Sequence, residues 1–207
     1  MRTRWMILPA LAVLATLTCA AAAADDDKDT FTDEGFIRTW LVLCPIPLDD
    51  GQSGADGLGK EQIKDEVKLA PKDGDKVKAG TKELTWKKHK TPEHMVDFNA
   101  ILGQQTEDSV GYAVCYVVAD NEMKVRMKTG SDDQLKVYLN GKKVFEMTDA
   151  RSADKDQDTT EVTLQKGVNT LVCKVVNEKV DWLLCVRFVD KDDKPVKGLK
   201  VRLTPKE

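Results

Sequence analysis

The fold of this chain is decided by residues 130–145, which read Gly-Ser-Asp-Asp-Gln-Leu-Lys-Val-Tyr-Leu-Asn-Gly-Lys-Lys-Val-Phe. Leu135–Leu139 alternates apolar and polar side chains, which predicts a strand with one apolar face. Asn140 and Gly141 tolerate the positive φ angles of a type I′ turn, so a second strand should return beside the first. A two-residue loop also fixes the register of the hairpin. The predicted facing pairs are Leu139 with Lys142, Tyr138 with Lys143, and Val137 with Val144.

Short apolar segments separated by turn residues continue on both sides of this hairpin. The first, Phe36–Cys44, should end at Pro45 and Pro47, because proline cannot donate to a strand ladder. Leu48–Gly59 contains four Gly and three Asp and should be an exposed loop. Tyr112–Ala119 is apolar throughout, as expected for a central strand covered on both faces. We therefore predict an antiparallel β-sandwich of about eight to ten strands, with one or two short helical turns.

The first 24 residues have the pattern of a secretory signal peptide. Arg2 and Arg4 precede the apolar run Ile7–Thr18, and the alanines that follow offer cleavage sites. The run is short for a membrane span, so we expect no transmembrane segment in the mature chain. Cys19 raises the question of a lipid anchor, but Thr18 stands where a lipobox has Gly, Ala or Ser. We expect an exported protein, periplasmic or extracellular, with a signal peptide at 1–24, an acidic flexible leader at 25–35 and a β-sandwich domain at 36–207.

The net charge of the mature chain argues against binding to nucleic acid. Removal of residues 1–24 leaves 30 basic and 35 acidic residues, a formal net charge of −5. An acidic chain of this kind offers no general attraction for nucleic acid or for an anionic membrane. We therefore expect no nucleic-acid partner.

Four cysteines remain after processing: Cys44, Cys115, Cys173 and Cys185. An even number in an exported chain permits disulfides. If Thr170–Val176 and Trp182–Val189 pair across their five-residue loop, Cys173 faces Cys185, and Cys44 with Cys115 is the other candidate pair. The alternative is that some of these cysteines are small buried residues in strands.

Several of these segments together resemble the galactose-binding-like jelly-roll domain of exported bacterial proteins. The stretch 40–45, Trp-Leu-Val-Leu-Cys-Pro, is similar to the Trp-x-x-x-Gly-Pro opening of that domain, with Cys44 in place of Gly. Segments 136–144 and 164–172 continue the pattern. The series is also similar to the sugar-binding domain of family 2 glycoside hydrolases and to protective-antigen-type lectin domains. The resemblance spans Phe36–Val189 and implies a sandwich of jelly-roll type.

An adjacent Asp pair binds Ca²⁺ in the lectin-type relatives, so the resemblance implies a possible Ca²⁺ site at Asp132 and Asp133. Because Ca²⁺ takes several oxygen ligands, Asp154 and Asp156 of a later loop are the candidates to complete it. Gln134 follows the pair here, where these relatives commonly have Gly. The alternative is that Asp132 caps the turn by accepting backbone N–H groups.

Two aromatic residues of the hairpin are candidates for sugar stacking. In the predicted register Tyr138 and Phe145 are diagonal neighbours on the face opposite Val137. An exposed pair would suit a sugar ring, whereas a second sheet or the loop 148–158 could equally cover it. The candidate ligand-binding residues are Asp132, Asp133, Tyr138, Phe145 and Arg151.

Three functions are compatible with the sequence. We expect a non-catalytic exported binding module, with carbohydrate as the ligand class that the resemblance implies. The alternative is a structural or protein-interaction domain that binds a protein of the cell envelope and no small ligand. A hydrolase acting on glycans comes third, because the chain has no nucleophile or zinc-protease motif and no pair among its 35 acidic residues is singled out.

Overall fold

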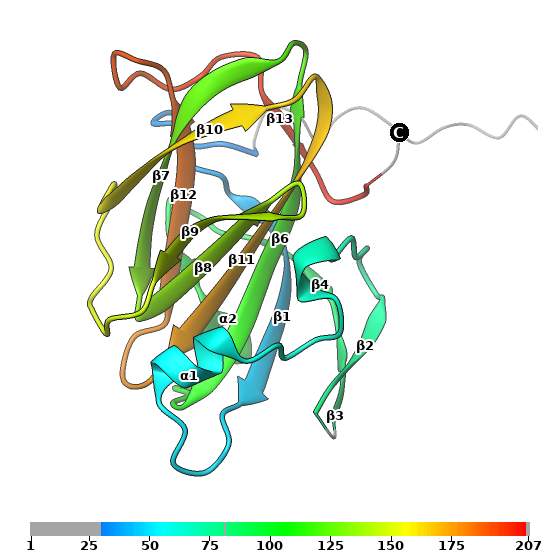
Figure 1. Ribbon diagram of the computed structural model, residues 1–207, viewed down its shortest axis with the longest axis vertical. Coiled ribbons are helices and arrows are strands. Elements are labelled where there is room, and N and C mark those ends of the chain that lie inside the picture. Colours follow the sequence, from blue (N-terminus) through cyan, green and yellow to red (C-terminus); the bar gives the residue numbers. More distant parts are fainter. Residues whose placement is uncertain (1–29, 81, 206–207) are drawn as a thin grey trace, which may run out of the picture.

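Two antiparallel β-sheets face each other and form the body of the fold (Figure 1). The computed structural model describes residues 30–80 and 82–205, so the predicted signal peptide at 1–24 lies outside the described residues. The larger sheet contains, in order, β4 (Lys87–Lys90), β1 (Thr39–Pro47), β6 (Ser109–Ala119), β11 (Gly167–Asn177), β8 (Gln134–Leu139) and β9 (Lys142–Met147), with β13 (Lys200–Arg202) paired to β6. The smaller sheet contains β10 (Asp158–Leu164), β7 (Met123–Asp132), β12 (Leu183–Val189) and β5 (Val96–Asp97).

Successive strands cross repeatedly from one sheet to the other. β6, β8, β9 and β11 lie in the larger sheet, whereas β7, β10 and β12 lie in the smaller one. This alternation buries one apolar face of each sheet against the other, in a core that includes Trp40, Met127, Val137, Trp182 and Val186. The predicted antiparallel β-sandwich of jelly-roll type is confirmed. Among the described residues it has 13 strands, and several of those beyond the predicted number are only two to four residues long.

A second apolar layer covers the outer face of the larger sheet. The segment 48–90 supplies it through α1 (Gly54–Gly59), the 3₁₀ turn η2 (Glu66–Lys68) and the ribbon of β2 (Lys76–Ala79) and β3 (Lys82–Thr85), and its last four residues are β4 of the larger sheet itself. Leu58, Ile63 and Trp86 from this segment pack against Tyr112 and Tyr138 of the sheet. In Figure 1 the segment lies on the side of the larger sheet away from β7, β10 and β12. Both faces of β6 are therefore buried, as its apolar run predicts.

The loop predicted at Leu48–Gly59 is wrong in part. Residues 54–59 form α1, and Gly54, Gly57 and Leu58 are buried. Ser53 caps this helix, since its hydroxyl accepts a bond from the backbone N–H of Asp56. Glycine permits the close packing, because a Cβ at Gly57 would lie 2.3 Å from a methyl carbon of Leu48. Of the four glycines that suggest an exposed loop here, Gly54 and Gly57 bring the backbone close to neighbouring side chains.

The two prolines that follow Cys44 do not end the first strand, contrary to the prediction. β1 runs from Thr39 to Pro47 and pairs with β6 on both sides of a shift between Leu43 and Ile46. The Cys44–Pro45 peptide bond, which is cis, lies within that irregularity. β4 pairs with β1 only as far as Val42, so beyond it no neighbour on that side needs an N–H from proline.

The hairpin of β8 and β9 confirms the turn and corrects the register. Asn140 and Gly141 have φ angles of 52° and 75°, as a type I′ turn requires. The pairs nearest the turn form as predicted, but a bulge then places Phe145, not Val144, opposite Val137. A bulge adds one residue to one strand and so reverses which side chains face the core. Val144 and Phe145 both pack against the core between the sheets.

The predicted disulfides are wrong, and Cys44, Cys115, Cys173 and Cys185 are all free. β11 and β12 follow each other along the chain but belong to different sheets, so they do not pair. Cys173 faces the core between the sheets, where Cys115 also lies. The Cys185 thiol lies 3.8 Å from the backbone oxygen of Asp154. Burial raises the pKa of the Cys185 thiol to about 12, so these strands hold cysteines as small buried side chains.

None of the helices in the described part of the chain is both long enough and apolar enough to cross a membrane.

Replacing Gly141 by valine is expected to lower the free energy of unfolding by about 1–3 kcal/mol, because a β-branched residue resists positive φ. A new Cβ would meet nothing closer than the backbone oxygen of Val67, at 3.7 Å, so the cost is one of backbone conformation. Urea unfolding of the purified protein measures the change. Gly141→Asn, which tolerates this conformation, should cost less, and equal losses would contradict the turn.

Candidate functional site

The predicted Asp pair lies where the chain crosses between the sheets. β7 of the smaller sheet ends at Asp132, and β8 of the larger sheet begins at Gln134. The Asp132–Asp133 peptide bond is cis. The loop 148–157 between β9 and β10 contributes Arg151 to the same place. The structure therefore brings together three of the five candidate ligand-binding residues.

The carboxylate of Asp133 accepts hydrogen bonds from the protein's own backbone. Its two carboxylate oxygens accept bonds from the backbone N–H groups of Arg151, at 3.2 Å, and Glu178, at 2.8 Å. The Asp133 backbone oxygen accepts a bond from the hydroxyl of Ser131. Asp133 thus ties two loops to the strand crossing, which is the capping role considered for Asp132.

The guanidinium of Arg151 also binds side chains of the protein itself. Its guanidinium pairs with both carboxylate oxygens of Asp158, at 3.0 and 2.6 Å, and donates to the hydroxyl of Ser131 at 3.0 Å. A bidentate arginine–carboxylate pair has a fixed geometry, so it restrains the loop 148–157 that carries Arg151. Arg151 therefore anchors the loop before β10.

Asp132 differs from Asp133 in its electrostatic surroundings. It is 6 % exposed and accepts a bond from the backbone N–H of Ala153. Burial, reinforced by the nearby charges of Asp133 and Asp181, raises the pKa of its carboxyl to about 6. This carboxyl takes up a proton at a much higher pH than an ordinary aspartate.

The four candidate Ca²⁺ ligands do not form a shared cage of oxygens. Asp133 is occupied by backbone N–H groups, and Asp156 pairs with the guanidinium of Arg187. Asp154 is exposed, and its backbone oxygen contacts Cys185. Within residues 30–80 and 82–205, no three His, Cys, Asp or Glu side chains are grouped so as to hold a metal ion. These residues do not fit Ca²⁺, and we assign it no role here.

Replacing Asp132 by asparagine is expected to raise stability relative to the wild type as the pH increases from 4 to 7. The carboxyl has a higher pKa in the folded state, so its ionisation between pH 3.8, the ordinary pKa of an aspartate, and about 6 favours the unfolded chain. Thermal melts of both proteins across this range measure the difference. A melting-temperature difference that does not change with pH would contradict this assignment. If Ca²⁺ were bound, adding it should stabilise the wild type and not the variant.

The two candidate aromatic residues are separated by the sheet. Tyr138 lies on the outer face of the larger sheet, where its hydroxyl donates to Glu66 at 2.9 Å. Phe145 is half-buried and packs toward the core between the sheets. The prediction that they share one face is wrong because of the β8–β9 bulge, and Tyr138 is covered by the segment 48–90.

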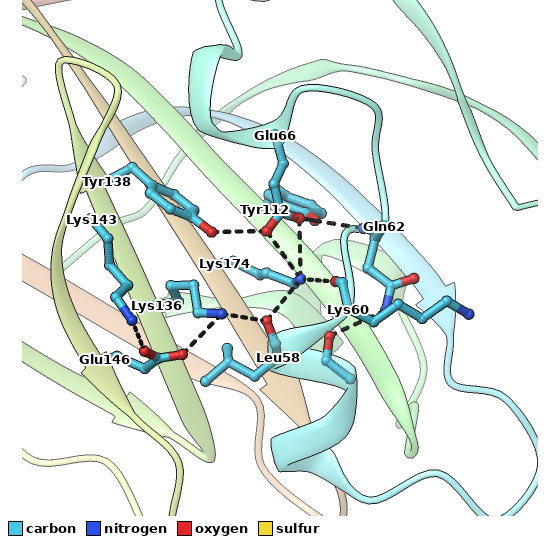
Figure 2. Close-up of polar contacts among 11 residues, drawn as sticks. Leu58, Lys60, Gln62, Glu66, Tyr112, Lys136, Tyr138, Lys143, Glu146 and Lys174 are labelled. Carbon is cyan, nitrogen blue, oxygen red and sulfur yellow. Dashed lines mark hydrogen bonds and ion pairs between the residues drawn. The ribbon is translucent and has the colours of Figure 1, made fainter.

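A buried polar network beneath that segment was not predicted from the sequence. Figure 2 shows the Glu66 carboxylate of η2 reaching down to side chains of three strands. It accepts bonds from the hydroxyls of Tyr112, at 2.5 Å, and Tyr138, and pairs with the ammonium of Lys174 at 3.1 Å. Lys174 is completely buried, and burial lowers its pKa. Each charged group is thus satisfied, as a buried ion pair requires.

Two lysines of this network also hold the end of α1. The ammonium groups of Lys136 and Lys174 both donate to the backbone oxygen of Leu58, at 2.8 and 3.0 Å, and Lys174 reaches that of Lys60 as well (Figure 2). The Leu58 carbonyl belongs to the last turn of α1 and Lys60 is the residue that caps it, a position where a nearby cation is favourable. The network fastens the segment 48–90 to the sheet, and its burial suits a structural role.

An open groove surrounds β10, one of the two edge strands of the smaller sheet. One hollow of about 540 Å³ has Lys124, Arg126 and Lys191 in its lining, and a second of about 460 Å³ has Leu139, Lys142 and Gln165. Glu161, Val162 and Thr163 line both hollows, so the two adjoin across the strand. We call these nine residues the β10 groove. None of them was predicted from the sequence to be a ligand-binding residue.

A comparison of the chain with protein-family models and with curated proteins finds no match.

Proposed function

We propose that this protein is an exported, non-catalytic module that binds carbohydrate, with the β10 groove as its binding surface. The observation that carries the proposal is the groove itself. Each of its two hollows has a volume within the range of small-ligand sites, about 300–1,000 Å³. Its position on paired strands supports a preformed surface, since β10 pairs with β7 along its whole length.

The chemistry of the groove suits a sugar ligand. Thr163 contributes a hydroxyl, Gln165 an amide, and Glu161 a carboxylate, which together donate to and accept from hydroxyl groups. By contrast, Asp133 and Arg151 are committed to internal bonds and Tyr138 is buried. The proposal therefore moves the binding surface from the Asp132–Asp133 loop to β10.

Binding of the purified protein to an array of immobilised glycans tests this proposal. We expect one class of glycan to bind, and the paired substitutions Glu161→Ala and Thr163→Ala to weaken binding. Thr159→Ala is the matched control, because Thr159 is exposed on the same strand outside the groove. A protein that binds no glycan, or variants that all bind equally, would overturn the proposal.

A protein-interaction domain of the cell envelope is the second candidate. β9 and β10 are each an edge strand of their sheet and lie beside the groove, so either edge offers unpaired backbone groups to an extended peptide. Binding to a panel of immobilised peptides, with no glycan bound, would favour this function.

A further inference from the structure

We propose that the β10 groove selects acidic glycans, that is, carbohydrate chains that carry carboxylate or sulfate groups. This inference rests on the proposed function and names its ligand class. Among the residues that the structure describes, four cationic ones line the groove, Lys124, Arg126, Lys142 and Lys191, against one acidic residue, Glu161. The chain as a whole has more acidic than basic residues, 35 against 32, so the groove reverses the balance of the molecule.

Two of these cations are available to a ligand. Lys124 and Lys142 are exposed, and neither has an ion-pair partner in the described part of the chain. Thr163 of β10 is the cross-strand partner of Lys124 on β7, so the two side chains extend from the same face of the sheet. A free ammonium next to a hydroxyl donor suits a sugar that bears both an anionic group and hydroxyls.

The other two cations frame the first hollow. Arg126 is held by the backbone oxygen of Asp190, to which its guanidinium donates at 3.2 and 2.8 Å. The carboxylate of Asp193 lies 3.5 Å from the same guanidinium. Lys191 contacts Asp192 at 3.1 Å, but both side chains are largely exposed, so a ligand can compete for the ammonium. The backbone contact fixes the position of Arg126 before any ligand arrives.

None of the described residues that line the groove is aromatic. Neutral sugars commonly gain affinity by stacking on an aromatic ring, and this surface offers none. Charged contacts and hydrogen bonds must therefore supply the affinity. Because each exposed ion pair contributes little, the preferred ligand is a polymer that repeats its anionic group along the groove. The binding should weaken strongly with added salt.

Titration of the purified protein with polygalacturonate tests this inference, with the fully methyl-esterified polymer as the neutral control. We expect the acidic polymer alone to bind at low salt. The triple variant Lys124→Ala, Lys142→Ala and Lys191→Ala should lower the affinity about tenfold, the combined effect of three exposed ion pairs. A matched variant with Lys64→Ala, Lys78→Ala and Lys87→Ala removes the same charge from exposed lysines of the segment 48–90 and should bind as the wild type does.

The outcomes separate this inference from the proposed function. If only neutral glycans bind, the proposed function stands and the acidic preference is wrong. If neither polymer nor any arrayed glycan binds, both are wrong. Equal losses in the two triple variants would show attraction by total charge and overturn the site. Equal binding of poly-glutamate would overturn the glycan class in favour of an acidic peptide.

Discussion

Replacing Glu66 by leucine is expected to lower the free energy of unfolding by about 3–5 kcal/mol, because the buried Lys174 ammonium then loses its counter-ion. The carboxylate of Glu66 is the only acidic group within ion-pair distance of Lys174 among the described residues. The substitution also removes the acceptor of two tyrosine hydroxyls, Tyr112 and Tyr138. Urea unfolding followed by tryptophan fluorescence measures the loss. The segment 48–90 should also become more sensitive to protease, since the network fastens it to the sheet.

Two comparisons isolate the buried pair from other effects of the substitution. Glu83→Leu breaks the exposed pair of Glu83 with Lys76 and should cost no more than about 1 kcal/mol. Adding Lys174→Met to Glu66→Leu should recover part of the stability, because no unpaired charge then stays buried. If Glu66→Leu costs no more than Glu83→Leu, Glu66 and Lys174 do not form a buried pair.

The sequence predicts strands well because strand formation depends on local patterns. The turn at Asn140 and Gly141 and the buried run of β6 both follow from nearest neighbours along the chain. The bulge in β9 does not, because Val144 and Phe145 are both apolar and either can face Val137. Local sequence patterns also do not show to which sheet a strand belongs. A five-residue link joins β11 and β12 as readily across the sandwich as in a hairpin, and the predicted Cys173–Cys185 pair is wrong for that reason.

The residues of the buried network lie far apart in the sequence. Glu66 precedes Lys174 by 108 residues, and only folding brings them together. One signal was present: Lys174 interrupts the apolar run of β11, and a lysine at a buried strand position needs a partner. The partner itself could not be identified, because the chain has 35 acidic residues. The β10 groove has no signal of this kind, since its lysines resemble the other surface lysines.

The Asp132–Asp133 loop shows how a motif can be located without its role being known. The two adjacent aspartates lie where the chain crosses from β7 of one sheet to β8 of the other. Their roles depend on atoms from distant loops, the backbone N–H groups of Arg151, Ala153 and Glu178. A pair of aspartates specifies two negative charges, but the neighbouring loops decide whether these charges meet a cation or a backbone donor.

Replacing Gly130 by alanine is expected to lower the free energy of unfolding by about 3 kcal/mol, at the upper end of the usual cost of overpacking. A Cβ at Gly130 would lie 1.8 Å from the backbone oxygen of Asp154, a contact that a change of side-chain rotamer cannot relieve. The loop 148–157 must therefore move away from β7. Arg151 and Asp158, whose ion pair holds this loop, should then separate. Thermal and urea unfolding of the variant measure the loss of stability.

The loss of stability in Gly130→Ala should come from the close approach of Gly130 to the Asp154 backbone, and not from the replacement of a glycine as such. Gly59→Ala is the matched control, because a Cβ there meets nothing within 4 Å and its φ lies outside the left-handed region. The control should leave the stability unchanged within about 0.5 kcal/mol. The loop leads directly into β10, which lines the groove. Movement of the loop should displace β10, so Gly130→Ala should also weaken glycan binding. A Gly130→Ala protein as stable as the control would show that the loop does not pack on β7 as described.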